Sequence, residues 1–347
     1  MAQALDALRH GWAIRIESAE GSLALLPAET AFAEGGLAAR TLLISAARAA
    51  TLKLINQREA ASPDTPVLIR GAELFELPLA RAIADPALDL EWPLKGPFVA
   101  EPLRQPGAAN AAMELARLAG ILPAFLVASG IEPAVEVTDT DIAAWTDPRR
   151  LTIQSRARLP VAALEATEIV AFRAPDDMRE HVALIVGTTD GGRPPLVRLH
   201  SECLTGDVFS SLRCDCGPQL DAALTAMAGE ARHGGWGVLL YLRQEGRGIG
   251  LINKLRAYAL QDQGFDTVDA NERLGFPSEA RDFPVAARML ELLGIGTVRL
   301  MTNNPAKIAA LEGEGIAVSG RVPHALPHNP HNLRYLATKR DRAGHLL

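Results

Sequence analysis

Cysteine is scarce in this chain of 347 residues, which contains only three. They cannot all pair as disulfides, and their tight grouping favours a reducing compartment in which a metal holds the thiolates. Acidic residues outnumber basic ones, 41 to 35, and the formal net charge of −6 argues against a general nucleic-acid binder. No run approaches the roughly 18 apolar residues that span a bilayer, and the first residues lack the basic and apolar regions of a signal peptide. We therefore expect a cytoplasmic protein without nucleic-acid or membrane partners.

The length and the hydrophobic content of 48% suit two domains, each with its own core. Apolar periodicity predicts an α/β or α+β fold, in which strands and helices follow one another along both halves. We place the boundary near residue 150, between a domain of residues 1–150 and a domain of residues 151–347. The stretch from Pro93 to Gly107 carries four prolines and should be mostly loop.

All three cysteines fall between Val197 and Gln219, in the spacing C-x10-C-x-C. The cluster lies between a predicted strand at 196–200 and a predicted helix at 219–232, on a loop of the kind that often carries function. Three thiolates can hold a zinc ion whose fourth position stays open for water, as in a catalytic site. Two alternatives remain: a structural zinc completed by His200, or buried free cysteines that act as small apolar residues. The spacing is not that of a zinc finger, so it does not name the chemistry.

A glycine-rich turn follows the predicted strand at 236–242. Gly246, Gly248 and Gly250 would let backbone N–H groups approach a ligand closely, and Arg247 adds a cation. The turn is neither a Walker A loop nor a dinucleotide fingerprint, and a plain tight turn explains it equally well.

A second candidate for phosphate binding lies at the start of a predicted helix after the strand at 295–302. Asn304 fits the N-cap and Pro305 the first helical position, so Lys307 would lie in the first turn beside exposed N–H groups. The alternative is a well-capped helix that bears a surface lysine.

Glu279 and Arg281 lie between Pro277 and Pro284. The first proline disfavours a continuous helix, so both side chains could face one ligand, whereas in a helix they would diverge. A solvated charged loop is the alternative. In the tail, four histidines are spaced irregularly among prolines, and we do not expect them to ligate a metal.

Taken together, several motifs resemble the GTP cyclohydrolase II family over residues 153–347. They are HSECLTGD, SLRCDCG, RQEGRGIGL, RAYALQD, LGF, RDF, TNNP and the final GHLL. The resemblance implies a layered α/β domain with one zinc ion per subunit, held by Cys203, Cys214 and Cys216. It implies Tyr258, Glu279 and Arg281 as catalytic residues. It also implies a set of GTP-binding residues: Arg198, Leu199, His200, Ser201, Glu202, Gln219, Glu245, Gly246, Arg247, Thr267, Thr302 and Lys307.

The implied reaction is the first step of riboflavin synthesis. Zinc would activate the water that attacks C8 of the guanine, and formate and diphosphate would leave, giving 2,5-diamino-6-(5-phosphoribosylamino)pyrimidin-4(3H)-one. Mg²⁺ is expected with the triphosphate, and the family suggests a homodimer. Arg281 takes the place of the family's proposed nucleophile, but a protonated guanidinium can equally stabilise charge. Glu279 stands where the family usually has aspartate, which predicts reduced turnover. The alternative is a GTP-binding zinc protein with lost or altered turnover.

The first half resembles dihydroxybutanone-phosphate synthase, most clearly over Ala111–Pro123. Ser18 and Ser22 stand where that family has acidic groups that bind magnesium, and RQPGAAN lacks its histidine. Too few hard oxygen ligands and no proton-transfer group remain, so we expect an inactive domain that serves packing or dimerisation.

Overall fold

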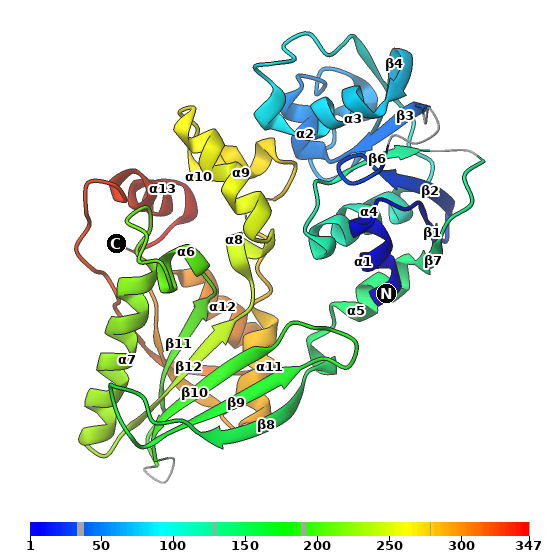
Figure 1. The fold of residues 1–347 in the computed structure, drawn as a ribbon. Coiled ribbons are helices and arrows are strands. Elements are labelled where there is room, and N and C mark those ends of the chain that lie inside the picture. Colours follow the sequence, from blue (N-terminus) through cyan, green and yellow to red (C-terminus); the bar gives the residue numbers. More distant parts are fainter. Residues whose placement is uncertain (33–37, 128–129, 189–191, 278, 347) are drawn as a thin grey trace. The chain divides into compact units, whose positions relative to one another are not determined.

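A computed structural model describes residues 1–32, 38–127, 130–188, 192–277 and 279–346. The described residues form two compact units, each made of two chain segments. The first unit comprises Met1–Asp147 and Gly248–Ala280, and the second comprises Pro148–Arg247 and Arg281–Leu347. Each unit has its own β-sheet with helices packed against it, which is the α/β class expected from the periodicity (Figure 1).

Seven strands form the sheet of the first unit within the described residues, in the order β5-β4-β3-β6-β2-β1-β7. Neighbours pair antiparallel, except β1 and β7, which are parallel. The strands are β1 (Ile14–Ser18), β2 (Gly21–Pro27), β3 (Ala38–Ile44), β4 (Val67–Glu76), β5 (Phe98–Glu101), β6 (Ala124–Val127) and β7 (Val135–Thr138).

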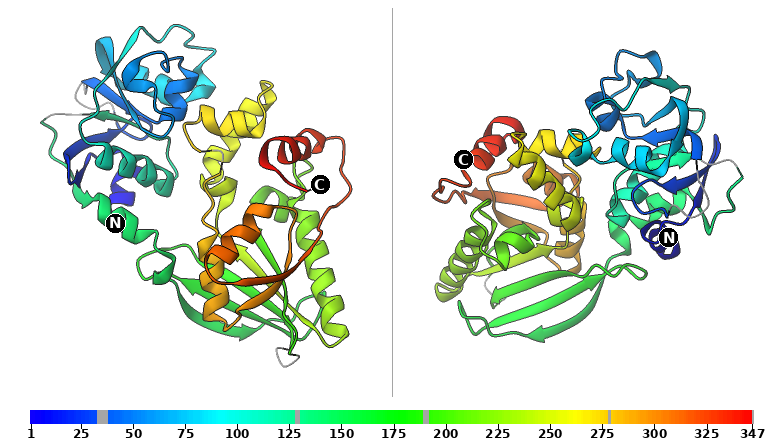
Figure 2. Two further views of the ribbon diagram at one scale, coloured as in Figure 1. Left: turned by 180° about the vertical axis from the view of Figure 1, so that it is seen from behind. Right: turned by 45° about the horizontal axis from the view of Figure 1, so that its top comes forward.

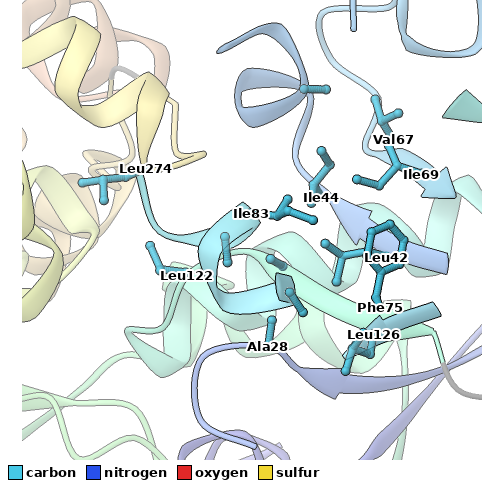
Figure 3. Packing of buried hydrophobic residues seen from close by; sticks show 14 of the residues in the cluster. Ala28, Leu42, Ile44, Val67, Ile69, Phe75, Ile83, Leu122, Leu126 and Leu274 are labelled. Carbon is cyan, nitrogen blue, oxygen red and sulfur yellow. The ribbon is translucent and has the colours of Figure 1, made fainter. Parts of the chain in front are cut away.

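Helices cover both faces of this sheet. Along β3, Leu42 and Ile44 join one apolar cluster and Leu43 joins the other, as the alternation of side chains in a strand requires. Figure 3 shows part of the first of these clusters, to which Leu42, Ile44 and Leu126 belong. The helices of residues 1–147 are α1 (Ala2–Arg9), α2 (Ala46–Thr51), α3 (Leu77–Ala84), α4 (Pro106–Ala119) and α5 (Asp139–Trp145), with short 3-10 turns at Arg58–Ala60 and Pro86–Leu88.

The segment Gly248–Ala280 packs into the core of the first unit, although it is distant in sequence. It carries α9 (Leu251–Asp262) and α10 (Thr267–Arg273). Its residues Ile249, Leu260, Leu274 and Phe276 are buried in the same cluster as Leu42 and Ile44. Arg256 adds a hydrogen bond of 2.8 Å from its Nη2 to Glu29 Oε1. The compact units therefore differ from a single cut at residue 150, because this segment groups with the first unit.

The sheet of the second unit also has seven strands in the described residues, in the order β14-β13-β11-β12-β10-β9-β8. The four strands β12, β11, β13 and β14 run parallel, whereas β8, β9 and β10 are antiparallel to their neighbours. The strands are β8 (Thr152–Arg158), β9 (Thr167–Arg173), β10 (His181–Gly187), β11 (Leu196–Ser201), β12 (Trp236–Leu242), β13 (Thr297–Met301) and β14 (Ala317–Val322).

Two layers of helices enclose this second sheet, on opposite faces (Figures 1 and 2). Met227 of α7 packs on Leu239, while Met289 of the α11 layer packs with Val238 and Leu240, the neighbours of Leu239 in β12. The helices are α6 (Leu204–Asp207), α7 (Cys216–Arg232), α8 (Glu245–Gly248), α11 (Pro284–Leu292), α12 (Pro305–Gly313) and α13 (Leu333–Ala343), with a 3-10 turn at Pro148–Arg150.

The elements expected around the cysteine cluster are present in the structure. The predicted helix at 219–232 corresponds to α7, and the predicted strand at 236–242 is β12. The proline-rich stretch is mostly irregular but contains β5, which pairs with β4. No helix was expected in the tail, where α13 forms after the last proline.

Candidate functional site

The parallel strands β11, β12 and β13 end at one edge of the second sheet, because parallel strands share a direction. The polar segments that follow them therefore meet there: Glu202–Cys203 after β11, Gln244–Arg247 after β12, and Thr302–Lys307 after β13. Ligands bind at this edge in open α/β sheets. The fold thus brings together the cysteine cluster, the glycine-rich turn and the helix start that bears Lys307, the three segments of the second unit for which the sequence suggested a binding role.

The three cysteines converge at this edge. Cys203 lies just before α6, Cys214 precedes α7, and Cys216 is the first residue of α7. Their sulfur atoms all lie within 4.8 Å of one another, and Cys203 Sγ is 3.7 Å from Cys214 Sγ. A tetrahedral zinc ion with Zn–S bonds of about 2.3 Å would set two sulfurs about 3.8 Å apart. The donor set therefore fits a zinc ion with three thiolate ligands.

His200 does not complete the cluster. Its Nε2 lies 3.0 Å from Asp207 Oδ1, and the imidazole stacks on the ring of Tyr241. Among the described residues, no fourth histidine, cysteine or acidic side chain joins the group of three sulfurs. This geometry leaves one tetrahedral position without a protein ligand, as a catalytic zinc requires.

Asp207 holds the loop that bears Cys203. Its carboxylate accepts hydrogen bonds from the Cys203 backbone N–H at 3.0 Å and from the Tyr241 hydroxyl at 2.8 Å, besides its contact with His200. Glu245 supports the same loop, because its Oε2 accepts the Leu204 N–H at 2.7 Å. Carboxylates in this outer position orient metal ligands and tune them.

Two glycines let the cysteine-bearing segments approach closely. A Cβ at Gly206 would lie 2.9 Å from Cys214 Sγ and 3.1 Å from Cys203 Sγ. A Cβ at Gly217 would lie 2.4 Å from the carbonyl oxygen of Gly206. Neither position has room for a side chain, so the sulfur cluster depends on both glycines.

The close approach of the three thiols raises the pKa of two of them. Hydrogen bonding with Cys203, reinforced by burial, raises the pKa of Cys214 to about 11. Hydrogen bonds with Cys203 and Cys214 raise the pKa of Cys216 well above its usual range. Binding of a cation would displace these protons, because thiolates are the ligating form.

A pocket beside Cys216 gathers most of the GTP-binding residues predicted in the second unit. Its lining includes ten of the predicted residues, namely Arg198, Leu199, His200, Ser201, Cys216, Gln219, Arg247, Arg281, Thr302 and Lys307. Five further residues line it that were not predicted to bind GTP: Asn303, Asn304, Tyr335, Lys339 and His345. The described lining residues include no aspartate or glutamate, so the pocket is suited to an anion.

Two buried polar atoms in this pocket have no hydrogen-bond partner among the described residues. Arg198 is buried, donates from Nη1 to Met301 O at 3.2 Å and from Nη2 to Gln219 Oε1, and burial lowers its pKa to about 10. Among the described residues, Arg198 Nε and Ser201 Oγ meet no hydrogen-bond partner. Buried groups of this kind normally have partners, so they indicate a polar molecule that binds here.

Lys307 is not a surface lysine. Its side chain is buried, and its Nζ donates to Leu199 O at 2.7 Å. The helix begins as expected, with Pro305 at the first position and the Asn304 side chain accepting the Ala306 N–H at 3.0 Å. The cation is thus fixed at the floor of the pocket, beside the helix N-terminus.

The glycine-rich turn contains a strained arginine. Gly246 has φ 62° and Arg247, which is not glycine, has φ 62° as well. A left-handed backbone at such a residue costs on the order of 1–3 kcal/mol and often marks a functional position. The turn directs Arg247 into the pocket lining.

The other predicted residues lie elsewhere. Glu202 pairs with Arg243 at 2.9 Å, and Glu245 and Gly246 form the turn without lining the pocket. Tyr258 on α9, Thr267 at the start of α10 and exposed Glu279 belong to the first unit, so their roles remain predictions.

The motif HSECLTGD contains Asp207, but the sequence did not predict a role for this residue. A single carboxylate near a cysteine does not reveal which groups will donate hydrogen bonds to it in the folded chain. Tyr335 and Lys339 are four residues apart in α13, which is the one signal that could have paired them.

The model of the family described as GTP cyclohydrolase II matches residues 152–323. None of the helices among the described residues has the length and apolar character needed to cross a membrane.

Relatives match far beyond that region. GTP cyclohydrolase-2 of Azospirillum brasilense is 43% identical over 99% of this chain and 93% of its own length. The GTP cyclohydrolase-2 of Azotobacter vinelandii is 64% identical over 49% of this chain and 79% of its own. The riboflavin biosynthesis protein RibBA of Salinispora arenicola is 47% identical over 71% of this chain and 62% of its own.

Among solved structures, a two-domain 3,4-dihydroxy-2-butanone 4-phosphate synthase from A. baumannii covers 93% of this chain and is itself covered to 99%. Its TM-score is 0.31 at 17% identity, a likeness that carries no argument about fold or function. The match to the Azospirillum enzyme does identify the family, since it runs over nearly the whole of both chains. The chain belongs to the GTP cyclohydrolase II family.

Proposed function

We propose that this protein catalyses the zinc-dependent hydrolysis of GTP to 2,5-diamino-6-(5-phosphoribosylamino)pyrimidin-4(3H)-one, formate and diphosphate, the first step of riboflavin synthesis. The observation that carries the proposal is the juxtaposition of three thiols and a cation-lined pocket, with Cys216 belonging to both. A zinc ion held by Cys203, Cys214 and Cys216 would acidify water and polarise a carbonyl oxygen, the chemistry that opening of the imidazole and release of formate require.

The pocket residues would bind and orient the nucleotide. Lys307 and Arg198 are buried cations with fixed partners, so they would meet the triphosphate with little loss of conformational entropy. Arg281 lines the same pocket and would stabilise the charge that develops as diphosphate leaves. We expect Mg²⁺ to accompany the triphosphate, as in other phosphoryl-transfer sites. Gln219, bonded to Arg198 through Oε1, would hold that guanidinium in place.

The reaction consumes three molecules of water. The first adds to C8 of the guanine and opens the ring to a formamide, the second releases formate from that amide, and the third cleaves the anhydride between the α- and β-phosphates. Tyr258 beside the base, Thr267 among the GTP contacts and Glu279 as proton acceptor complete the proposed site. We further propose one zinc ion per subunit, a cytoplasmic homodimer, and a division of labour at residue 150 in which residues 1–150 do not turn over ribulose 5-phosphate.

The direct test is incubation of the purified protein with GTP, following formate, diphosphate and zinc content together. Formate release in proportion to bound zinc is expected. Binding of GTP without formate would favour the alternative, a GTP-binding zinc protein that has lost or altered its turnover.

Glu279 motivates this alternative, because its carboxylate is one methylene further from the backbone than the usual aspartate. A displacement of about 1 Å can cost on the order of 100-fold in rate. Glu279→Asp should therefore raise kcat for formate release by up to about 100-fold, with KM for GTP nearly unchanged. A lower kcat in Glu279→Asp would contradict this interpretation. Glu272→Asp, in α10, is a control that shortens a neighbouring glutamate not assigned to the site.

A further inference from the structure

The C-terminal helix α13 and the residues after it form one wall of the pocket. Tyr335, Lys339 and His345 all belong to the pocket lining. The region matched by the family model ends at residue 323, so this wall lies outside it. Neither the expected GTP-binding set nor the expected catalytic set includes any residue of this segment.

Hydrogen bonds join this wall to the rest of the pocket. The ammonium of Lys339 donates to Asp215 Oδ1 at 2.7 Å, with its side chain 12% exposed, and lies 4.4 Å above the ring centroid of Tyr335. Asp215 Oδ2 in turn accepts from Gln219 Nε2 at 2.6 Å. Lys339 thus connects to Gln219, whose Oε1 accepts from Arg198.

The chain after α13 is fixed by its backbone. His345 N–H donates to Lys339 O at 3.1 Å, and Leu346 N–H donates to Asn303 O at 2.8 Å. Asn303 lies just beyond β13, in the segment that also bears Thr302 and Lys307. These bonds hold the segment that places His345 in the pocket lining. The described lining residues include no carboxylate that could pair with its imidazole.

The charges of the pocket point to a polyanion. Five cationic side chains line it: Arg198, Arg247, Arg281, Lys307 and Lys339. Asp215, which is not among the described lining residues, offsets part of this charge through Lys339. Burial together with the charges of Lys339, Arg281, Lys307 and Arg247 lowers the pKa of His345 to about 4, so the imidazole is neutral and can donate a hydrogen bond.

We propose that Lys339 and His345 bind the phosphate chain of the nucleotide, making the C-terminal segment part of the substrate site. An ammonium has three donors, and Asp215 takes one of them, so Lys339 can hold phosphate oxygens while the carboxylate keeps it in place. Because the ligand is identified as a nucleoside triphosphate, this inference rests on the proposed function. The competing explanation is that Lys339 only clamps Asp215 at the start of α7, next to Cys216.

The test compares Lys339→Ala, Lys339→Arg and, as a matched control, Arg340→Ala. Arg340 is the next residue of α13, is exposed and pairs with Asp341 outside the pocket. Calorimetric titration with inorganic tripolyphosphate and with GTP, at constant ionic strength, gives the dissociation constants, and metal analysis gives the zinc content. Lys339→Ala should weaken binding of both probes about 10- to 100-fold at unchanged zinc content. Lys339→Arg should retain most of the affinity, and Arg340→Ala should match the parent protein. His345→Ala should weaken tripolyphosphate binding by a smaller factor.

Two binding results would overturn the proposal: the parent protein does not bind tripolyphosphate, or Lys339→Ala binds both probes as tightly as the parent protein does. A third would be loss of zinc from Lys339→Ala while its zinc-loaded fraction keeps the parent affinity for both probes. Its failure can be told apart from failure of the proposed function. A parent protein that releases no formate but binds tripolyphosphate through Lys339 refutes only the proposed turnover. A parent protein that turns over GTP while Lys339→Ala binds both probes equally well refutes only the role of the C-terminal segment.

Discussion

The two units differ in the surroundings of their buried positive charges. In the first unit, buried Arg48 donates to both carboxylate oxygens of Asp89, at 3.0 and 2.7 Å, and Lys95 and Arg273 approach the same carboxylate. In the second unit, cations gather around a pocket whose described lining residues include no carboxylate. Both units rest on sheets of seven strands in the described part of the chain, so the difference does not lie in architecture.

This difference separates charges that are enclosed in the fold from charges that line a pocket. Burial by itself raises the pKa of Asp89, but the hydrogen bonds and charges of Arg48 and Lys95 outweigh it, so the pKa lies below its ordinary value. Asp89 is therefore ionised and compensates its neighbours permanently. In the second unit Asp215 compensates Lys339 at 2.7 Å, and we infer that a bound anion would add to that compensation. The comparison can be tested by removing one group at a time from each unit.

The largest effect is expected at the cysteine cluster. Cys214→Ser removes one of three sulfurs that lie within 4.8 Å of one another, and a hydroxyl is a poor zinc ligand. Zinc content should fall to near zero, and formate release should drop by at least about 100-fold, since even outer partners of a metal site are worth 10- to 100-fold. Metal analysis and a formate assay measure both quantities. His328→Ala, which removes an exposed imidazole of the tail, should change neither; full zinc occupancy in Cys214→Ser would refute the assignment.

The next effect is expected in the first unit, on stability rather than binding. Asp89→Asn leaves Arg48, only 2% exposed, without its anionic partner, which should lower the free energy of unfolding by about 3–5 kcal/mol. Asp6→Asn is the matched control, because Asp6 is exposed and faces His10 at 3.4 Å, a pair worth under about 1 kcal/mol. Urea denaturation measures both variants, and titration with tripolyphosphate should give the parent affinity in each. A loss of affinity in Asp89→Asn without loss of stability would reverse the distinction drawn between the two units.

The sequence was most informative where one local pattern determines the outcome. The capped start of α12 followed from Asn304 and Pro305, and the strand β12 followed from an unbroken apolar run. The grouping of Cys203 with Cys214 and Cys216 could be expected because the three share one loop region. The direction of neighbouring strands then brought Lys307 and Arg198 to the same edge, which no local pattern encodes.

The features that the sequence did not reveal depend on partners far away in the chain. Lys339 meets Asp215 across 124 residues, and Leu274 joins a core formed mainly by residues before 127. Helix α13 could not be predicted, because its polar composition gives little apolar periodicity and irregularly spaced histidines and prolines precede it. Asp207 accepts bonds from three groups, and only the folded chain shows that they converge. Long-range packing, rather than composition, determines these parts of the site.

The smallest effect, and the most local one, separates two glycines of α7. A Cβ at Gly217 would lie 2.4 Å from Gly206 O, whereas a Cβ at Gly229 meets nothing within 4 Å. Gly217→Ala should push α6 away from α7 at a cost of about 1–3 kcal/mol and weaken zinc binding, because a Cβ built at Gly206 would already lie within 3.1 Å of two of the sulfurs. Gly229→Ala should instead stabilise the protein by up to about 1 kcal/mol, since alanine favours a helix interior.

Denaturant titration of both variants, with zinc affinity measured by competition with a chelator, checks this pair. The two substitutions add the same methyl group to the same helix, so propensity alone would move stability in one direction for both. Opposite signs, with zinc affinity lowered in Gly217→Ala only, would show that close backbone contact holds the sulfur cluster together. Equal changes in stability for the two variants would mean that the backbone around Gly206 relaxes to make room for the added methyl group. The site of the second unit would then tolerate a substitution as readily as an exposed position of the first unit.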